Sequence, residues 1–207
     1  IKNETNILSK IKNETNITEK LRISKSSTEL TLFPKTKTEL ITIIKDEINK
    51  NGYKCDLNHI DVSEIEDMSY LFYRTDFNGD VSEWNVSHVE DMTCMFRMSE
   101  FNGDISSWDV SNVTNMSNMF SRSQFNGDIS KWNVISVKDM EAMFFSSIFN
   151  GDISSWDISK VEDMSHMFQD SAFCKDISNW KINQHCKIRH MFTDCDINKN
   201  YIPKAAR

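Results

Sequence analysis

The stretch FNGDISSWDVSNVTNMSNMF at residues 101–120 decides the fold, because its pattern recurs along the chain every 24 residues. The tryptophans show the period most clearly: they stand at Trp84, Trp108, Trp132, Trp156 and Trp180. Two columns of phenylalanine keep the same register, one from Phe77 to Phe173 and one from Phe72 to Phe192. Residues 53–196 therefore form six units of 24 residues, and such a period indicates a stacked repeat protein.

Within a unit, the apolar side chains change their spacing. Residues 105–110 have the Leu-x-x-Leu-x-Leu spacing of a leucine-rich-repeat strand. Residues 113–120 place Val, Met, Met and Phe at i, i+3, i+6 and i+7, which predicts a short helix. Capping boxes at its start support the helix: Ser63-x-x-Glu66, Ser87-x-x-Glu90 and Ser159-x-x-Glu162. The Asn-Gly pair at 102–103 then supplies the turn to the next strand.

A single strand-helix unit cannot bury its own apolar face, so the units must stack. We therefore expect an α/β solenoid, a leucine-rich-repeat-like, right-handed stack of about six units with a parallel sheet on one side. Residues 34–52 predict an N-terminal capping helix that shields the first unit, and residues 197–207 form a C-terminal tail. Residues 1–33 predict a polar linker or stalk, in which Ile-Lys-Asn-Glu-Thr-Asn-Ile occurs twice, from Ile1 and from Ile11.

A family resemblance rests on FNGDISSWDVSNVTNMSNMF (101–120) and on the leader PKTKTELITIIKDEINKNGYKCDLNHIDVSEIEDMSYLF (34–72). Both resemble the BspA-like leucine-rich repeat proteins, and more narrowly the domain of unknown function found in many bacterial surface proteins and lipoproteins. The resemblance covers about residues 34–203. It implies a solenoid that is often exported and is associated with adhesion or host-protein binding, and it implies no catalytic residues.

The repeat leaves little room for catalytic chemistry. Four of the five glycines belong to the repeat, and Gly52 follows the predicted capping helix, so none remains for a phosphate-binding loop. No G-x-S-x-G, H-E-x-x-H or P-loop pattern occurs. We therefore expect a protein that is not an enzyme and that uses no cofactor.

The charge of the repeats narrows the class of partner. Residues 53–196 carry 11 Lys and Arg against 24 Asp and Glu, a net charge of −13. An acidic solenoid without a basic stripe argues against nucleic acid and against anionic lipid. The chain also lacks the run of about 20 apolar residues that a membrane-spanning helix needs. We expect an unidentified protein partner, whose attraction would come from a basic surface.

Two groups of side chains raise the question of metal binding. An aspartate recurs at one position of every unit: Asp56, Asp80, Asp104, Asp128, Asp152 and Asp176. These carboxylates could bind calcium between units, but acceptance of backbone N–H groups in their own turns is the favoured interpretation. Glu162, His166, Cys186 and His190 align on neighbouring units and suit zinc. The degenerate closing unit explains the same four residues, so we predict no metal.

The candidate partner-binding residues are those that depart from the repeat. In the unit at 125–148, Ile135 and Ile148 replace the polar or small residues of other units, and Phe145 is the one Phe of the repeats outside the two Phe columns. Clustered apolar surface usually marks an interaction site. Variable polar positions on the strand side add Lys131, His88 and Lys160 to the candidates.

Three functional hypotheses follow. The preferred one is a non-enzymatic protein-binding or adhesion module, displayed at a cell surface or secreted. The second is a structural protein that self-associates into a coat or oligomer. The third is an intracellular scaffold or inhibitor, which would be cytoplasmic.

Overall fold

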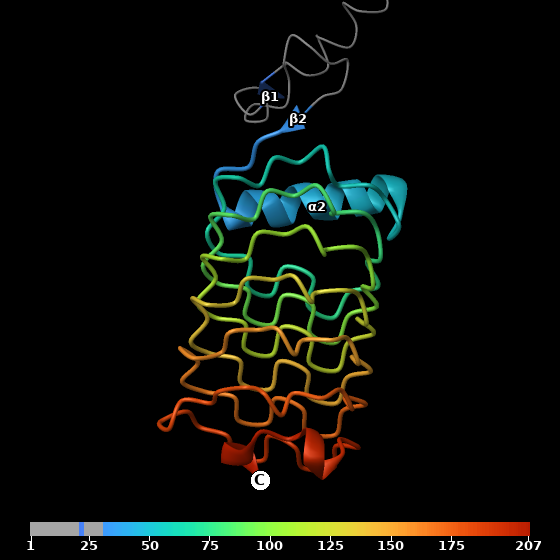
Figure 1. The fold of residues 1–207 in the computed structure, drawn as a ribbon. Coiled ribbons are helices and arrows are strands. Elements are labelled where there is room, and N and C mark those ends of the chain that lie inside the picture. Colours follow the sequence, from blue (N-terminus) through green and yellow to red (C-terminus); the bar gives the residue numbers. More distant parts are fainter. Residues whose placement is uncertain (1–20, 23–30) are drawn as a thin grey trace, which may run out of the picture.

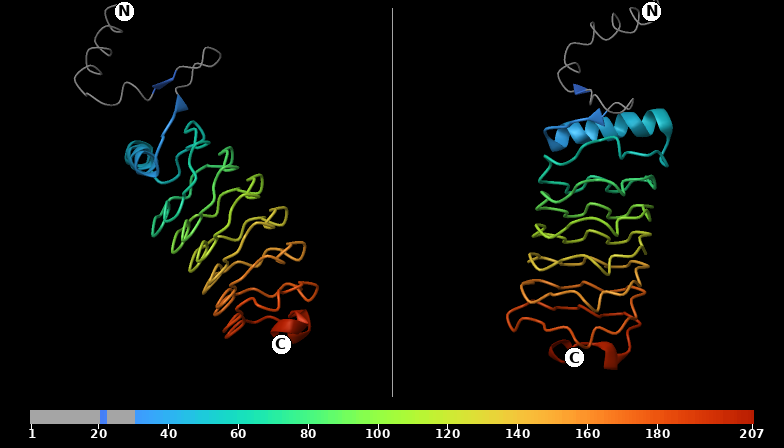
Figure 2. Two further views of the ribbon diagram at one scale, coloured as in Figure 1. Left: turned by 90° about the vertical axis from the view of Figure 1, so that its left-hand side faces the viewer. Right: turned by 45° about the horizontal axis from the view of Figure 1, so that its top comes forward.

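The computed structural model describes residues 21–22 and 31–207, and these form a stack of similar rungs (Figure 1). Most of the predicted linker at 1–33 lies outside the described residues. The regular elements lie at the two ends of the stack. They are β1 (Leu21–Arg22), β2 (Thr31–Leu32), α2 (Lys37–Asn51) and the 3-10 helices η1 (Lys199–Tyr201) and η2 (Lys204–Ala206). Each rung is a flattened loop of chain, as the edge-on view in Figure 2 shows.

Helix α2 lies across the N-terminal end of the stack (Figure 1). Its N-cap is Thr36, whose hydroxyl accepts a hydrogen bond from the Glu39 N–H, and Gly52 ends it with a φ of 83°. Leu40 and Ile44 are buried and belong to the apolar core of the rungs. The helix therefore covers apolar surface that the first rung would otherwise expose.

The short strand β2 joins the same end of the stack. It pairs antiparallel with β1, and Leu32 also bridges Ile60 of the first rung in a parallel arrangement. The Leu32 N–H donates to the carbonyl of His59 at 3.0 Å, and the Asp61 N–H donates to the Leu32 carbonyl at 2.8 Å. The backbone of the first rung is thus satisfied by β2 on this side.

The short helix predicted in each unit is wrong, since no helix occurs between α2 and η1. At 113–120, the Met119 N–H instead donates to the Met116 carbonyl at 3.2 Å, which closes a four-residue turn. Asn118 has a φ of 57°, and this positive value interrupts any helix. Successive turns repeat apolar side chains at spacings of three and four, so they imitate the helical pattern. The predicted capping boxes therefore cap no helix.

These turns carry the main ladder between rungs. We call the segments that contain them the turn column: residues 68–76, 92–100, 116–124, 140–148 and 164–172. In each segment, every second N–H donates to a carbonyl of the next rung. In one segment these bonds are Met92 to Asn115, Cys94 to Ser117, Phe96 to Met119 and Met98 to Ser121, at 2.9–3.0 Å. The result is a parallel, backbone-to-backbone ladder that runs the length of the stack.

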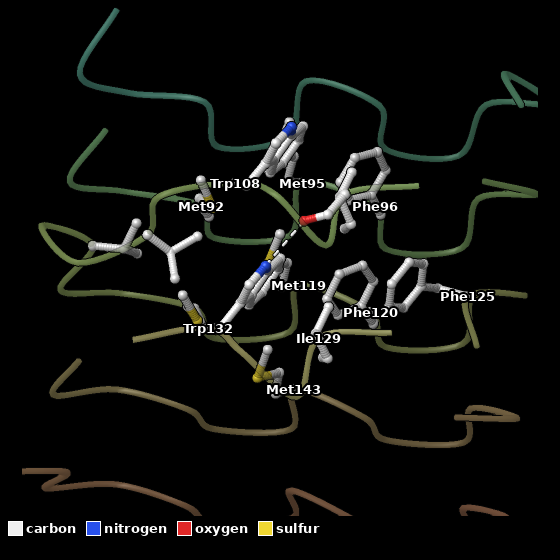
Figure 3. Close-up of a cluster of buried hydrophobic side chains, with 14 of the residues drawn as sticks. Met92, Met95, Phe96, Trp108, Met119, Phe120, Phe125, Ile129, Trp132 and Met143 are labelled. Atoms are coloured by element: carbon white, nitrogen blue, oxygen red, sulfur yellow. Dashed lines mark hydrogen bonds between the residues drawn. The ribbon is translucent and has the colours of Figure 1, made fainter. Parts of the chain in front are cut away.

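The other long side of each rung, which we call the Trp side, contains the segments 81–89, 105–113, 129–137, 153–161 and 177–185. The strand predicted at 105–110 is not present there, because the Trp108 N–H donates to the Ile105 carbonyl at 3.2 Å and forms a turn. Side chains, rather than backbone N–H groups, link this side of neighbouring rungs. Each buried indole Nε1–H donates to a carbonyl of the preceding rung at 3.0–3.1 Å, and Figure 3 draws this bond for Trp132.

The core lies between the two sides and is made of stacked columns (Figure 3). Phe96 and Phe120 stack at 5.7 Å between ring centroids, and Trp84 and Trp108 stack at 6.4 Å. The predicted core columns are confirmed in the central units, whose Trp, Phe and Met side chains at these positions are at most 4 % exposed. Tyr53, in the first unit, is 51 % exposed. The column therefore opens to solvent at that end.

The repeated glycines serve packing and not turn geometry, contrary to the prediction. None of the repeat glycines has a positive φ. A Cβ on Gly127 would lie 2.8 Å from the ring of Phe125, and one on Gly79 would lie 2.0 Å from the Cys55 carbonyl oxygen. The neighbouring asparagines link rungs, since each side-chain oxygen accepts the N–H of the residue 24 positions later. The bonds run Asn78 to Asn102, Asn102 to Asn126, Asn126 to Asn150 and Asn150 to Cys174.

Candidate partner-binding surface

The structure divides the predicted partner-binding residues between the two sides of the stack. Phe145 and Ile148 lie in the turn column. Ile135, Lys131, Lys160 and His88 lie on the Trp side. The six residues therefore do not form one surface, and each side has to be assessed by itself.

Phe145 and Ile148 expose apolar surface on the turn column. Ile148 is 47 % exposed, and Phe145 is half-buried. The guanidinium carbon of Arg122 lies 5.4 Å from the centroid of the Phe145 ring, in the range of a cation–π contact. The Arg122 N–H also donates to the Phe145 carbonyl at 2.8 Å, which fixes the two residues on adjacent rungs.

Three arginines lie on the same turn column, and one of them, Arg122, contacts Phe145; none of them was predicted from the sequence. Arg74, Arg97 and Arg122 belong to three successive segments of the turn column. Arg74 and Arg122 are exposed, and Arg97 is half-buried. Arg74 lies 5.3 Å from the centroid of the Tyr73 ring. Their spacing in the sequence could have indicated this grouping. Arg74 and Arg122 are two periods apart, and Arg97 is one residue away from the equivalent position in the unit between them.

The Trp side presents scattered polar groups. His88, Lys131 and Lys160 are exposed. Ile135 is half-buried and takes the place of a serine, since its N–H donates to the Asn133 side-chain oxygen at 3.3 Å as serine N–H groups do in other units. A single half-buried isoleucine adds little apolar surface there.

Comparison with known proteins bears on the whole repeat region. Residues 42–147 and 100–204 each match a family described as Mycoplasma protein of unknown function, DUF285. Together the two matches span well over half of the chain. The chain belongs to this family. No curated protein and no solved structure matches it.

The aspartate ladder of this DUF285 chain has the predicted structural role. Each carboxylate accepts the N–H of the residue two positions later; for Asp104 the donor is Ser106, at 2.9 Å. The same bond recurs from Asp56 to Asp176. These hydrogen bonds stabilise the ionised form, so the pKa of Asp104 and that of Asp128 lie below the usual Asp range. The prediction that these carboxylates close their own turns is confirmed.

A second acidic column runs along the start of the turn column of the DUF285 chain. Parallel bridges join Asp67, Asp91, Asn115, Asp139 and Asp163, and Lys187 follows them. Burial raises the pKa of Asp139. Burial also acts to raise the pKa of Asp163, but hydrogen bonds from Ser165 and Lys187 lower it on balance. Lysines pair with the terminal carboxylates: Lys37 with Asp67 at 2.9 Å and Lys187 with Asp163 at 3.0 Å.

The residues considered for zinc do not assemble into a site. Their positions are as follows: Glu162 is exposed, the rings of His166 and His190 stack at 5.3 Å, and Cys186 is partly buried. The pKa of Cys186 is raised to about 11, chiefly by burial, so the thiol is protonated at neutral pH. Over residues 31–207, no group of three or more His, Cys, Asp or Glu side chains is placed to hold a metal ion.

The thiols and the helices of the DUF285 chain bear on disulfide bonding and on membrane insertion. Its cysteines, Cys55, Cys94, Cys174, Cys186 and Cys195, are all free thiols in the structure. None of the helices in the described part of the chain has the length and apolar character needed to cross a membrane.

Proposed function

We propose that this chain is a non-enzymatic protein-binding module of the BspA-like repeat type, displayed at a cell surface or secreted. In this proposal its fold is a leucine-rich-repeat-like, right-handed solenoid, and its role is recognition or adhesion. The net negative charge of the repeats attracts, at long range, a partner that carries basic groups. Membership of a family without a described function gives no role by itself, so the proposal rests on the surface of the turn column.

The observation that carries the proposal is the exposed apolar surface at Ile148 and Phe145. Elsewhere in the central rungs, the bulky apolar side chains lie in the core columns, apart from the half-buried Met98 and Ile135. Ile148 occupies a position held by Gln124 and Ala172 in the flanking rungs. Phe145 stands where the rung before has Ser121. Neither side chain is needed to build a rung, and exposed apolar surface of this kind favours protein interaction.

The non-enzymatic part of the proposal rests on how the recurring polar groups are used. Carboxylates at three places in a rung accept N–H groups two residues later, as Asp104, Asp109 and Asp163 do. Buried serines such as Ser123 close turns by donating to a backbone carbonyl. The polar side chains that repeat therefore support the backbone of their own rung.

Self-assembly by end-to-end stacking is less favoured, because both ends of the stack are covered. Helix α2 lies over the first rung, and η1 and η2 lie over the last (Figure 1). At the C-terminal end, Ile197 and Pro203 are buried. A binding role for the side of the stack is accordingly preferred to a filament.

The test removes the exposed apolar surface and leaves the rung intact. The double variant Phe145→Ser and Ile148→Gln places residues that neighbouring rungs already use at these positions. Tyr53→Ser is the matched control, since it removes a ring that is 51 % exposed at the far end of the repeat. A third variant, Ile135→Ser, tests the apolar candidate of the Trp side.

Each protein is immobilised, exposed to extracts of the organism's surroundings and washed, and retained proteins are identified by mass spectrometry. We expect one set of proteins to be retained by the wild type and by Tyr53→Ser and to be lost with Phe145→Ser/Ile148→Gln. Circular dichroism confirms that each variant is folded. Retention of the same proteins by the double variant contradicts the proposal.

A further inference from the structure

A row of arginines and aromatic rings follows the turn column over four rungs. We call it the arginine strip, and it consists of Tyr73, Arg74, Arg97, Met98, Arg122 and Phe145. Its chemistry differs from that of the repeats as a whole, whose net charge over residues 53–196 is −13. Arginine and large aromatic side chains are the types enriched at the energetic centres of protein interfaces.

Backbone bonds of the turn column join the strip from rung to rung. The Arg74 N–H donates to the Arg97 carbonyl at 3.0 Å, the Met98 N–H donates to the carbonyl of Ser121, which precedes Arg122, at 2.9 Å, and the Arg122 N–H donates to the Phe145 carbonyl at 2.8 Å. The Arg74 Nε also lies 3.3 Å from the sulfur of Met98. The ladder of the turn column therefore holds these side chains in fixed order along one edge.

The arginines of the strip lack acidic partners. Ion pairs in the described part of the chain are made by lysines and one histidine, and none involves Arg74, Arg97 or Arg122. The Nε of Arg97 is also buried without a hydrogen-bond partner, as is the hydroxyl of Ser121. Ser121 is only 1 % exposed. A buried donor without a partner is costly, so the packing around Arg97 leaves a hydrogen-bonding requirement unmet.

We propose that the arginine strip binds an extended, acidic peptide segment of another protein. This proposal rests on the proposed function and names the kind of partner that the turn column takes. Carboxylates of the segment pair with Arg74, Arg97 and Arg122, in the forked geometry that suits guanidinium groups. An apolar side chain of the same segment packs on Phe145 and Ile148.

The spacing of the strip suits such a segment. Rungs lie about 4.8 Å apart, as in other parallel ladders, so Arg74 and Arg122 stand roughly 10 Å apart. A peptide in the extended polyproline II conformation rises about 3.1 Å per residue with three residues per turn, so its carboxylates three residues apart share one face about 9 Å apart and match this separation. Turn-column carbonyls and N–H groups are already paired within the ladder, so the affinity has to come from side chains.

The unpaired guanidinium groups of the strip favour a partner segment that is locally acidic, although the acidic repeats as a whole favour a basic partner. A basic segment would meet three unpaired guanidinium groups. A nucleic acid would bring a phosphate every few ångströms. These phosphates would be repelled by the carboxylates of the aspartate ladder and of the second acidic column. An acidic segment with only a few carboxylates can pair them with the arginines. Little of its negative charge is then left to be repelled by the acidic repeats.

The experiment selects ligands from random peptides displayed on phage, with the wild-type chain as bait. A parallel selection uses Arg74→Gln/Arg97→Gln/Arg122→Gln. Its matched control is Lys54→Gln/Lys175→Gln/Lys181→Gln, which changes the net charge equally at exposed lysines outside the strip. The enriched peptides are synthesised with a fluorophore, and fluorescence anisotropy measures their affinity for each protein.

We expect the wild type to enrich peptides of net negative charge that contain an apolar residue. Their affinity should fall about tenfold or more in the arginine variant and less than about twofold in the lysine control. If the triple arginine variant does not fold, Arg74→Gln/Arg122→Gln keeps the half-buried Arg97 and replaces it in the comparison.

Neutral or basic enriched peptides, or equal loss in the arginine and lysine variants, would overturn the inference. The same holds if no peptide is enriched, or if single-stranded RNA or phosphatidylglycerol vesicles compete better than an acidic peptide. The proposed function is judged separately. Retention of proteins that depends on Phe145 and Ile148 supports it even where the arginine strip takes no acidic peptide.

Discussion

The two long sides of a rung are held to their neighbours by different means. On the turn column, N–H groups such as those of Met116 and Asn118 donate to carbonyls of the next rung, at 2.9 and 2.7 Å. On the Trp side, the links come from side chains, such as the indoles of Trp108 and Trp132. A backbone ladder leaves outward side chains free to vary, whereas a side-chain ladder requires the same residue in each unit. The turn column can therefore carry specific function on a constant frame.

The largest expected effect comes from breaking the backbone ladder at one residue. Asn118→Pro removes an N–H that donates to the Glu141 carbonyl at 2.7 Å, and it imposes a negative φ where Asn118 has 57°. We expect a loss of about 3 kcal/mol or more in the free energy of unfolding, measured by urea denaturation.

Asn118→Gly is the control for that variant, because glycine keeps the N–H and adopts positive φ without strain. Its stability should stay within about 0.5 kcal/mol of the wild type. Equal losses in the two variants would mean that the Asn118 side chain, and not its backbone, holds this part of the rung.

An intermediate effect is expected from a conservative change on the Trp side. Trp132→Phe keeps an aromatic ring but removes the indole N–H and leaves the Ile105 carbonyl without its partner. The free energy of unfolding should fall by about 2 kcal/mol. Met119→Leu, an equally buried but conservative change on the turn column, should cost less than about 1.5 kcal/mol. A larger loss for Met119→Leu would contradict the distinction between the sides.

The sequence was sufficient for the period and for the core columns, because stacked rings and thioethers must recur where each rung meets the next. It was also sufficient for the role of Asp104, whose carboxylate closes its turn as aspartates commonly do. It was not sufficient for local structure at 113–120, because consecutive turns and a helix share the same apolar spacing. Positive φ at residues such as Met98 leaves no sign in the amino-acid type.

The candidate site was predictable in part for a related reason. Phe145 and Ile148 stood out because they depart from the repeat. Arg97 and Arg122 did not, because polar residues vary at outward positions in every unit. Only the ladder of the turn column brings the arginines into neighbouring columns, where no ion pair of the described residues joins them to a carboxylate.

The smallest expected effect concerns the buried acidic column beside the turns. Burial raises the pKa of Asp139, so its ionised form is less stable in the fold than in the unfolded chain. The favourable contribution of Asp139 to the free energy of unfolding is complete below its pKa in the unfolded chain. It is lost as the pH rises through its pKa in the folded protein. Asp139→Asn should therefore stabilise the protein at neutral pH, by less than about 1 kcal/mol because the site is partly solvated. Asn115 already shows that asparagine fits this column.

The direction of the pH dependence reverses for the aspartate ladder. A hydrogen bond from the Ser130 N–H lowers the pKa of Asp128, so its contribution is present above the unfolded pKa and lost as the pH falls through the folded pKa. Asp128→Asn should lower stability at neutral pH and not in acid. Urea midpoints at neutral pH and at about pH 3 measure both variants. Destabilisation by Asp139→Asn at neutral pH would contradict this assignment.

The central claim is that the turn column binds the partner while the Trp side acts as scaffold, and side-chain nitrogen resonances test it most directly. Two-dimensional NMR of ¹⁵N-labelled protein resolves the indole N–H groups of the Trp side and the Nε–H groups of Arg74, Arg97 and Arg122. On titration with a selected acidic peptide, the arginine resonances should shift and the tryptophan resonances should stay in place. Shifts confined to the indoles, with the arginines unchanged, would contradict the account.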